Sequence, residues 1–196
     1  KILLVEQKHF FGGYALSEEF KINNLDSSEF IKNLEDDLSN HENVILKKNF
    51  SIVGVHDHSY LLGLENLEVL ESEDQSSIRH RLWRIRTKHL ILATGAIERP
   101  LVFAGNDIPG VILSSAANEF YKLYGISQGD RVILITNNDS AYTAVVELFN
   151  AGISIPLVID VREKSVGELP LKVKELGIRV EFGKAIAKVL GKKQIF

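Results

Sequence analysis

The sequence predicts an α/β fold of parallel sheets with crossover helices, interrupted by an antiparallel β-meander. Two stretches of the 196-residue chain follow the order strand, helix, strand, which is how parallel sheets with crossover helices are built. Between these stretches, three strand-like runs follow one another without a helix, which is typical of a meander. Short apolar runs such as Ile2–Val5 are typical of strands buried on both faces of a parallel sheet.

The first stretch, residues 1–46, begins with the predicted strand Ile2–Val5 and a loop, QKHFFGG, that ends in Gly12 and Gly13. A helix is predicted over residues 29–41, because apolar residues recur there at helical spacing: Phe30, Ile31, Leu34 and Leu38. Ser27 is its candidate N-cap. Val44–Leu46 is the second predicted strand.

The meander is predicted over residues 50–90 from the runs SIVGVHDH, YLLGLENLEVLE and RLWRIRTKHLIL, with Glu71–Ser77 as its most exposed loop. The third run continues into the apolar segment Leu90–Ala96. Strand alternation puts His56 and His58 on one face and Asp57 on the other, so we interpret them as exposed turn residues rather than metal ligands.

The second stretch repeats the plan after Pro109–Gly110. Its predicted elements are the helix Ser114–Tyr124, the strand Arg131–Thr136, the helix Asp139–Ala151, the strand Ile155–Asp160, the helix Leu169–Leu176 with Pro170 near its first turn, and the strand Ile178–Phe182. We expect two domains, over residues 1–110 and 111–196.

Composition and charge narrow the function classes. Lys and Arg total 23 against 26 Asp and Glu, a net charge of −3, which argues against nucleic acid and against an anionic membrane surface as partners. The basic run RHRLWRIRTKH (Arg79–His89) alternates with apolar residues, so we interpret it as a strand with a solvated face, part of which contacts a partner subunit. Without cysteine the chain has no disulfide or thiol nucleophile, and we expect a cytoplasmic protein. Both ends fall inside strand-like patterns, so we expect a piece of a longer protein.

Two motifs suggest dinucleotide binding. Glu6 ends the first predicted strand, where such folds place an acid that accepts hydrogen bonds from the adenosine ribose. The glycine-rich turn that such folds place about 20 residues before this acid is absent from this sequence, and the alternative is a solvated strand-end carboxylate. The second motif is the small turn Ala93–Ala96, in which Thr94 and Gly95 allow close backbone approach to a cofactor. The alternative interpretation of this motif is an ordinary tight turn at the end of a strand.

The segments ATGAIERPLVFAGNDIPGVILSSA (Ala93–Ala116) and GDRVILITNNDSAYTAVVELFNAG (Gly129–Gly152) carry a closer likeness. They resemble the α subunit of heterotetrameric sarcosine oxidase, in the thioredoxin-reductase-like family of two-dinucleotide-binding flavoproteins. The likeness covers about residues 5–162. The likeness is shared with subunits of opine oxidase, hydrogen cyanide synthase and dye-linked proline dehydrogenase, so these enzymes are alternative functions for the chain. A degenerate, non-binding assembly scaffold is an alternative of another class.

The resemblance implies an FAD/NAD(P)-binding, Rossmann-like fold in the central part of an α subunit. It implies an incomplete dinucleotide-binding domain over residues 1–110 and a truncated, NAD-binding-like domain over residues 111–196. It implies β, γ and δ partner subunits, an amine substrate held on another subunit, FAD on the β subunit, with FMN at the α–β interface. The α subunit would carry NAD at the first site, with FAD as the alternative there, through Glu6, Gly12, Gly13, Thr94 and Gly95. No catalytic residue is expected in this chain.

The second strand–turn–helix departs from the glycine pattern G-x-G-x-x-G. Thr136, Asn138 and Ala141 occupy the three glycine places. Asn138 can adopt the left-handed conformation that such a turn would use, and Asp139 or Ser140 is a candidate N-cap. Asp160 ends the next strand, where a ribose-binding acid belongs. We expect a retained fold without a dinucleotide at this second site.

Overall fold

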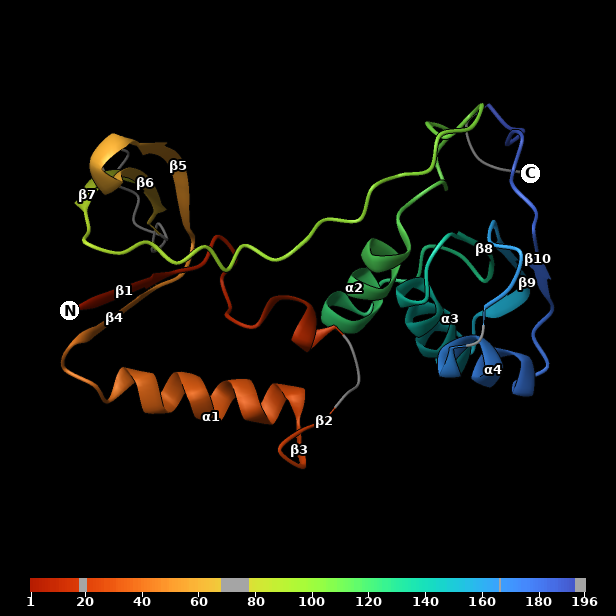
Figure 1. The fold of residues 1–196 in the computed structure, drawn as a ribbon, viewed down its shortest axis with the longest axis horizontal. Coiled ribbons are helices and arrows are strands. Elements are labelled where there is room, and N and C mark those ends of the chain that lie inside the picture. The colour runs from red at the N-terminus through yellow and green to blue at the C-terminus, as the bar shows by residue number, and fades with distance from the viewer. Residues whose placement is uncertain (18–20, 68–77, 166, 193–196) are drawn as a thin grey trace, which may run out of the picture. The chain divides into compact units, whose positions relative to one another are not determined.

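The computed structural model describes residues 1–17, 21–67, 78–165 and 167–192. The chain divides into two compact units (Figure 1). Unit 1 comprises Lys1–Gly13 and Phe20–Gly95, and unit 2 comprises Tyr14–Glu19 and Ala96–Phe196. Each unit contains a parallel sheet. The assignment of residues 1–110 and 111–196 to two dinucleotide-binding domains stays a prediction.

Unit 1 begins with the predicted strand–helix–strand order. Strands β1 (Ile2–Val5) and β4 (Val44–Lys47) pair in parallel, with Ile2 opposite Val44. Helix α1 (Ser27–Ser39) connects them after a short hairpin of β2 (Lys21–Ile22) and β3 (Leu25–Asp26). The predicted cap is displaced by one residue: Ser27 is the first residue of the helix, and Asp26 holds the N-cap position without a side-chain cap hydrogen bond.

The predicted meander is confirmed. Strands β5 (Phe50–His56), β6 (Tyr60–Asn66) and β7 (His80–Arg86) form an antiparallel sheet in that order. One face packs Phe50 against Gly63, where an added Cβ would lie 2.3 Å from the Phe50 ring. His58 has a φ of 58° in the 3-10 turn Asp57–Ser59 (η2), so the predicted turn is found there. The expected loop Glu71–Ser77 lies outside the described residues.

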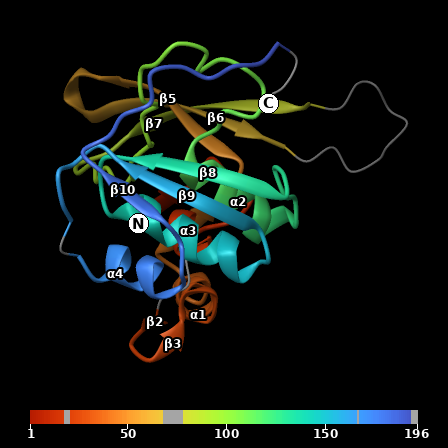
Figure 2. The same ribbon diagram turned by 90° about the vertical axis from the view of Figure 1, so that its right-hand side faces the viewer.

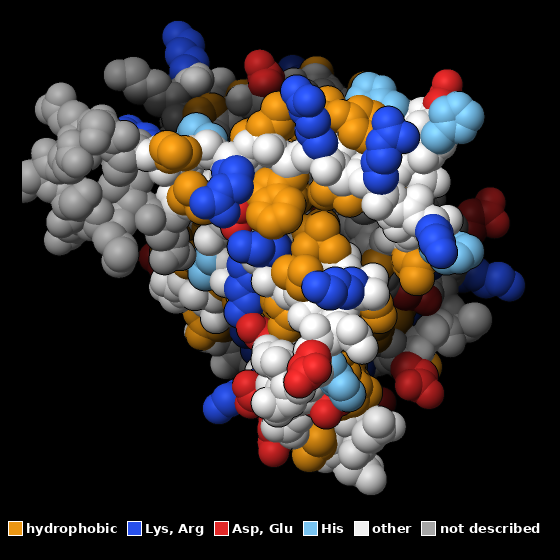
Figure 3. All heavy atoms as spheres, turned by 90° about the vertical axis from the view of Figure 1, so that its left-hand side faces the viewer, with side chains coloured by type: hydrophobic (Ala, Val, Ile, Leu, Met, Phe, Trp, Pro, Cys, Tyr) orange, Lys and Arg blue, Asp and Glu red, His pale blue; other side chains and the backbone are white. Residues whose placement is uncertain are grey.

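A buried carboxylate stabilises the meander. Glu65 is 5% exposed, and its two oxygens accept hydrogen bonds from Lys47 (2.7 Å) and from the indole of Trp83 (2.8 Å). Arg81 lies 3.3 Å from the same carboxylate. These hydrogen bonds, that of Lys47 foremost, hold the pKa of Glu65 below its usual range despite burial. Figure 3 shows Lys and Arg side chains interspersed with hydrophobic ones on a face of unit 1.

The segment after β7 differs from expectation. The third strand-like run, RLWRIRTKHLIL, was expected to reach Leu92, but β7 ends at Arg86 and residues 90–100 are irregular. Ile91 is 88% exposed and Leu92 71% exposed. A strand needs a partner edge for its backbone groups, and among the described residues no strand pairs with this segment. Its apolar composition alone therefore overpredicted strand structure.

Unit 2 contains a three-stranded parallel sheet with helices packed on one face. The strands β8 (Arg131–Thr136), β9 (Ser154–Asp160) and β10 (Val180–Phe182) lie in the order β10-β9-β8. Figures 1 and 2 both place the helices on one side of this sheet: α2 (Ser114–Tyr124), α3 (Ser140–Asn150) and α4 (Glu168–Glu175). Pro170 lies in the first turn of α4, as predicted. All six predicted elements of this stretch are present.

The core of unit 2 lies between α3 and the sheet. Val145, Val158 and Val173 are fully buried, and they come from α3, β9 and α4 respectively. A largely buried ion pair between Lys122 of α2 and Glu147 of α3 joins the first two helices. In the part of the chain that the structure describes, no helix is long and apolar enough to cross a membrane.

Candidate functional site

Glu6, Gly12 and Gly13 lie on the segment that follows β1 in unit 1. One carboxylate oxygen of Glu6, Oε1, accepts a 2.9 Å hydrogen bond from the backbone N–H of Lys8, which holds the side chain at the strand end. Gly12 has a φ of 113° and Gly13 a φ of 52°, both in the region that favours glycine. A Cβ at Gly13 would meet no heavy atom within 4 Å, so the backbone is open there. A half-buried carboxylate and an open glycine backbone suit the ribose of a nucleotide.

Thr94 and Gly95 lie on the exposed segment after β7. Gly95 has a φ of 69° and open space around its Cα. Among the described residues no hydrogen bond joins Thr94 or Gly95 to Glu6 or to the glycine pair. The structure thus brings Glu6, Gly12 and Gly13 onto one loop and leaves Thr94 and Gly95 on a separate segment.

The turn between β8 and α3 in unit 2 is held by side chains instead of glycines. The buried hydroxyl of Thr136 accepts a hydrogen bond from the N–H of Asn138 (3.1 Å) and donates one to its carbonyl (2.9 Å). The Asn138 side-chain oxygen accepts bonds from the Ser140 hydroxyl (2.7 Å) and the Ala141 N–H (3.4 Å). The backbone of Asn138 is not in the left-handed conformation that was expected for this turn. The fold of the turn is nevertheless kept.

Asp160, the residue in the ribose-binding place of unit 2, is completely buried. The hydroxyl of Tyr142 donates a 2.8 Å hydrogen bond to Oδ2, and Arg162 donates from Nη2 to the same oxygen at 2.6 Å. Oδ1 accepts from the backbone N–H and from Nε of Arg162, each at 3.0 Å. Both oxygens are therefore engaged within the chain.

The ionisable groups of this cluster shift one another's pKa values. Burial acts to raise the pKa of Asp160, but the hydrogen bonds from Arg162 and Tyr142 outweigh it and hold that pKa below its ordinary value. Burial, together with the Asp160 carboxylate, raises the pKa of the Tyr142 hydroxyl. Tyr142 is thus a neutral donor to an ionised carboxylate.

Arg162 also bridges to the start of α3. Its Nη2 donates a 2.7 Å hydrogen bond to Oδ1 of Asp139, and the hydroxyl of Ser165 donates to the same oxygen at 3.0 Å. Asp139 holds the N-cap position of α3, as predicted, but its side chain makes no cap hydrogen bond. Hydrogen bonding to Arg162 lowers the pKa of Asp139. The Asp139–Arg162–Asp160 network therefore links the start of α3 to the end of β9.

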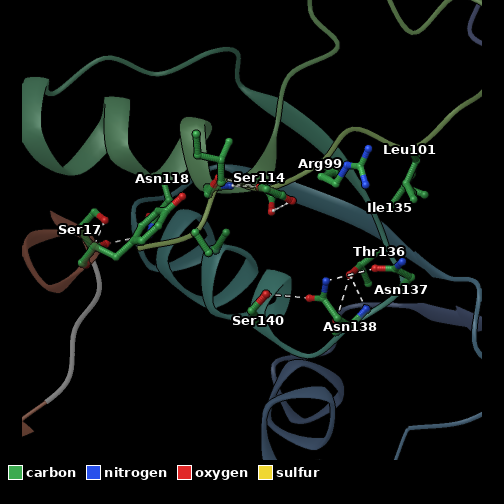
Figure 4. Close-up of a pocket in the computed structure, with 16 residues that line it drawn as sticks. Ser17, Arg99, Leu101, Ser114, Asn118, Ile135, Thr136, Asn137, Asn138 and Ser140 are labelled. Carbon is green, nitrogen blue, oxygen red and sulfur yellow. Dashed lines mark hydrogen bonds between the residues drawn. The ribbon is translucent and has the colours of Figure 1, made fainter. Parts of the chain in front are cut away.

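Residues of the turn between β8 and α3 also line a cavity of about 480 Å³ in unit 2 (Figure 4). It is bounded by the end of β8, the starts of α2 and α3, the segment 96–101 and part of the segment 14–17. The Glu98 carboxylate in its wall accepts hydrogen bonds from Ser114 Oγ (2.9 Å), Ser115 N–H (2.8 Å) and Ser115 Oγ (2.6 Å). Glu98 thus caps the N-terminus of α2 across 16 residues of chain.

Sequence reasoning missed several residues of unit 2. Glu98 and Arg162 act through contacts distant in the chain, and no local spacing signals such contacts. Tyr142 carried a weak signal, because its hydroxyl and the Glu147 carboxylate are the polar groups among the buried side chains of α3. The described residues contain no group of three or more His, Cys, Asp or Glu side chains able to hold a metal.

Comparison with curated proteins gives consistent relatives, although no family model matches the chain. It is 33% identical to the sarcosine oxidase α subunit of Rhizobium meliloti (strain 1021) over 163 residues, 83% of this chain and 16% of that protein. It is 30% identical to the α subunit from Corynebacterium sp. (strain P-1) over 191 residues, 95% of this chain and 19% of that protein. An opine oxidase subunit of Agrobacterium tumefaciens (strain Ach5) is 34% identical over 76 residues, 39% of this chain and 15% of that protein. The chain thus spans less than a fifth of the length of these relatives.

Solved structures show the same fold. The chain superposes on L-proline dehydrogenase from P. horikoshii with a TM-score of 0.62 and 20% identity, over 98% of this chain and 32% of that one. The water-forming NADH oxidase of Lactobacillus brevis, bound to NADH, gives a TM-score of 0.59 and 11% identity over 98% of this chain and 43% of that one. The expected Rossmann-like fold of FAD/NAD(P)-dependent oxidoreductases is therefore confirmed. The chain belongs to the same family as the sarcosine oxidase α subunits, and it corresponds to a segment of them.

Proposed function

We propose that this chain is the dinucleotide-holding part of the α subunit of a sarcosine oxidase-type oxidoreductase, which oxidatively demethylates sarcosine. The observation that carries the proposal is the 33% identity to a sarcosine oxidase α subunit over 83% of the chain. The likeness to an opine oxidase subunit covers 39% of the chain, which makes an opine, amine or proline dehydrogenase subunit, or a hydrogen cyanide synthase subunit, the second candidate.

The proposed dinucleotide site is in unit 1. Glu6 would accept hydrogen bonds from the adenosine ribose through its second oxygen, since Oε1 is held by Lys8. Gly12 and Gly13 would let the backbone approach the cofactor, as would Thr94 and Gly95 after β7. NAD is the proposed cofactor, and FAD, which has the same ADP half, is the alternative. The bound cofactor would supply the redox chemistry, and these residues would bind and orient it.

The amine substrate and the remaining cofactors are proposed to lie on other chains. The relatives are named as alpha subunits, which fits a complex with further subunits. For these we propose β, γ and δ chains, with FMN at the α–β interface. The cytoplasm is the proposed compartment.

Unit 2 is proposed to keep its fold without holding a dinucleotide. Asp160 supports this, because it is fully buried and both its oxygens already accept hydrogen bonds from Tyr142 and Arg162. A ribose hydroxyl would have to displace a charge-assisted bond to bind there. A degenerate, non-binding assembly scaffold is the remaining alternative for the chain as a whole.

The test uses the natural full-length protein, purified with the chains that accompany it. We would measure sarcosine-dependent oxygen consumption and identify the nucleotides released on denaturation. The proposal expects turnover of sarcosine in preference to proline or opines, and one NAD per copy of this chain. Turnover of an opine or proline with no activity on sarcosine would move the assignment to the second candidate, and absence of any dinucleotide would contradict the site.

A further inference from the structure

Strand β7 is an outer strand of the meander, and one of its edges is unpaired among the described residues. It pairs with β6 along all seven of its residues, His80–Arg86. In the described part of the chain no strand lies on its other side. The backbone N–H and C=O groups along that side are therefore able to pair with an added strand.

The face of the meander that carries Arg84 and Arg86 has positive charge without a carboxylate beside it. Both arginines are exposed, and neither makes an ion pair among the described residues. The strands β5, β6 and β7 contain one acidic residue, Glu65, and it lies opposite Arg81 on the other face of the sheet. The face of Arg84 and Arg86 is thus left with unneutralised charge.

Arg86 is already positioned to bind an anion. Its guanidinium carbon lies 5.3 Å from the centre of the Tyr60 ring, which is directly opposite on β6. A guanidinium that stacks on a ring keeps its N–H groups available to form paired hydrogen bonds with a carboxylate. Because the ring already restricts this side chain, binding a carboxylate would cost it less conformational entropy.

Leucines adjoin the arginines on the same face. Leu62 lies opposite Arg84, and Leu64 lies opposite Leu82, which is 58% exposed. Charge on an edge strand is a common means of preventing unwanted pairing. That role needs no exposed leucine, whereas arginine next to apolar side chains is typical of a surface that another protein covers.

A second copy of this chain does not complement the edge. Two paired β7 strands would bring together the three arginines of each copy, and like charges across a strand pair are destabilising. An occupant that carries carboxylates would meet the same arginines with opposite charge. The charge of β7 therefore selects an acidic occupant and disfavours self-association.

We propose that the free edge of β7 binds an extended segment of a partner subunit, which adds to the meander as a fourth strand. Side chains directly opposite one another in paired strands lie about 5 Å apart, so alternate residues of the segment would meet Arg86, Arg84 and Leu82. The segment would read acidic–x–acidic–x–apolar, in either chain direction. The inference rests on the proposed complex of subunits, and the dinucleotide site has no part in it.

The first measurement is hydrogen exchange of the natural full-length protein, alone and purified with the chains that accompany it. The peptide that covers β7 should exchange at least tenfold more slowly in the complex, because its outward amides gain acceptors there. Arg84→Glu/Arg86→Glu should abolish this slowing. The matched control is Lys21→Glu/Lys32→Glu, which reverses two exposed charges of unit 1 outside the meander and should retain it. Both double variants should melt as the wild type does, because all four side chains are exposed.

The second measurement is cross-linking of the complex. Arg84→Lys/Arg86→Lys keeps both charges and supplies primary amines, which a carbodiimide couples directly to carboxylates in ion-pair contact. Mass spectrometry of the digested complex should find both amines joined to alternate acidic residues of one segment in an accompanying chain. Exposed Lys32 on α1 should give no product with that segment.

A complex that oxidises sarcosine but shows equal β7 exchange with and without the accompanying chains would overturn this inference and leave the proposed function standing. Purification without any accompanying chain would contradict both. Slower β7 exchange caused by phosphatidylglycerol vesicles or by a single-stranded oligonucleotide alone would overturn the inference in favour of a membrane or a nucleic acid. Cross-links between positions 84 and 86 of two copies would overturn it in favour of self-association.

Discussion

The hydroxyl of Tyr142 on α3 donates a 2.8 Å hydrogen bond to Oδ2 of Asp160, the completely buried last residue of β9. Together with Arg162, it turns a strand-end carboxylate that could face a ligand into an internal link between helix and sheet. The same arginine extends the link to Asp139 at the start of α3. The turn that joins β8 to α3 is therefore tied to the following strand by ionic hydrogen bonds.

Asp160→Asn should destabilise unit 2 by about 2 kcal/mol, because the bonds from Arg162 lose their charge on the acceptor side. The measurement is hydrogen exchange of peptides from α3 and β9 in the full-length protein. Exposed Asp130, just before β8, provides the matched control, and Asp130→Asn should leave exchange unchanged. Equal protection in both variants would contradict the stabilising role of the network.

The same network should make the stability of unit 2 depend on acid pH. The pKa values of Asp139 and Asp160 are lowered in the folded state, so each carboxylate contributes stability above its unfolded pKa, near 4. That contribution is lost as the pH falls below about 4 toward the folded values. Asp160→Asn should flatten the acid limb of stability against pH in the same exchange measurement. An acid limb identical to that of the wild type would show that Asp160 does not titrate with folding.

Glu65→Ala should destabilise unit 1 by about 2–3 kcal/mol. The change leaves the indole N–H of Trp83 and the ammonium of Lys47 without their shared acceptor inside the meander. Exchange of peptides from β6 and β7 would report the loss. Glu42→Ala removes an exposed carboxylate from the same unit and serves as the control. Unchanged protection of β6 in Glu65→Ala would show that this carboxylate does not hold the sheet together.

Glycine at positions 136, 138 and 141 together should lower the free energy of unfolding of unit 2 by about 2–3 kcal/mol. The variant loses the Thr136 and Asn138 side-chain bonds across the turn, adds glycine inside α3 and enlarges the unfolded ensemble. It should not gain dinucleotide binding, because both oxygens of Asp160 still accept hydrogen bonds from Tyr142 and Arg162. Thr136→Ser keeps the hydroxyl and should remain near wild-type stability by thermal melting. A triple variant that melts as the wild type does, or that takes up a second NAD, would contradict this view of the turn.

Periodicity and residue type predicted the elements of both units because helices and strands are set by neighbours close in the chain. Ser114–Tyr124 and Arg131–Thr136 match the structure residue for residue. Prediction failed where distant groups decide. Leu90–Ala93 has strand composition but no paired strand among the described residues, and the side chain of Asp139 turns to Arg162 instead of capping its helix. Asp160 was expected at a strand end, but its burial and its hydrogen bond from Tyr142, 18 residues away, could not be predicted from residues close in the chain.

The dinucleotide is proposed to bind in unit 1, and the turn of unit 2 is proposed to hold none. The direct measurement is the NAD content of the purified full-length protein in two variants, Glu6→Gln and Asn138→Trp, each with its melting temperature. Glu6→Gln removes a charged acceptor worth about 1.5–3 kcal/mol to a bound ribose, so NAD occupancy should fall with an unchanged melt. Asn138→Trp places a large side chain in the exposed turn of unit 2 and should keep full occupancy. Loss of NAD from Asn138→Trp with an unchanged melt, while Glu6→Gln retains it, would contradict the account and move the site to the turn before α3.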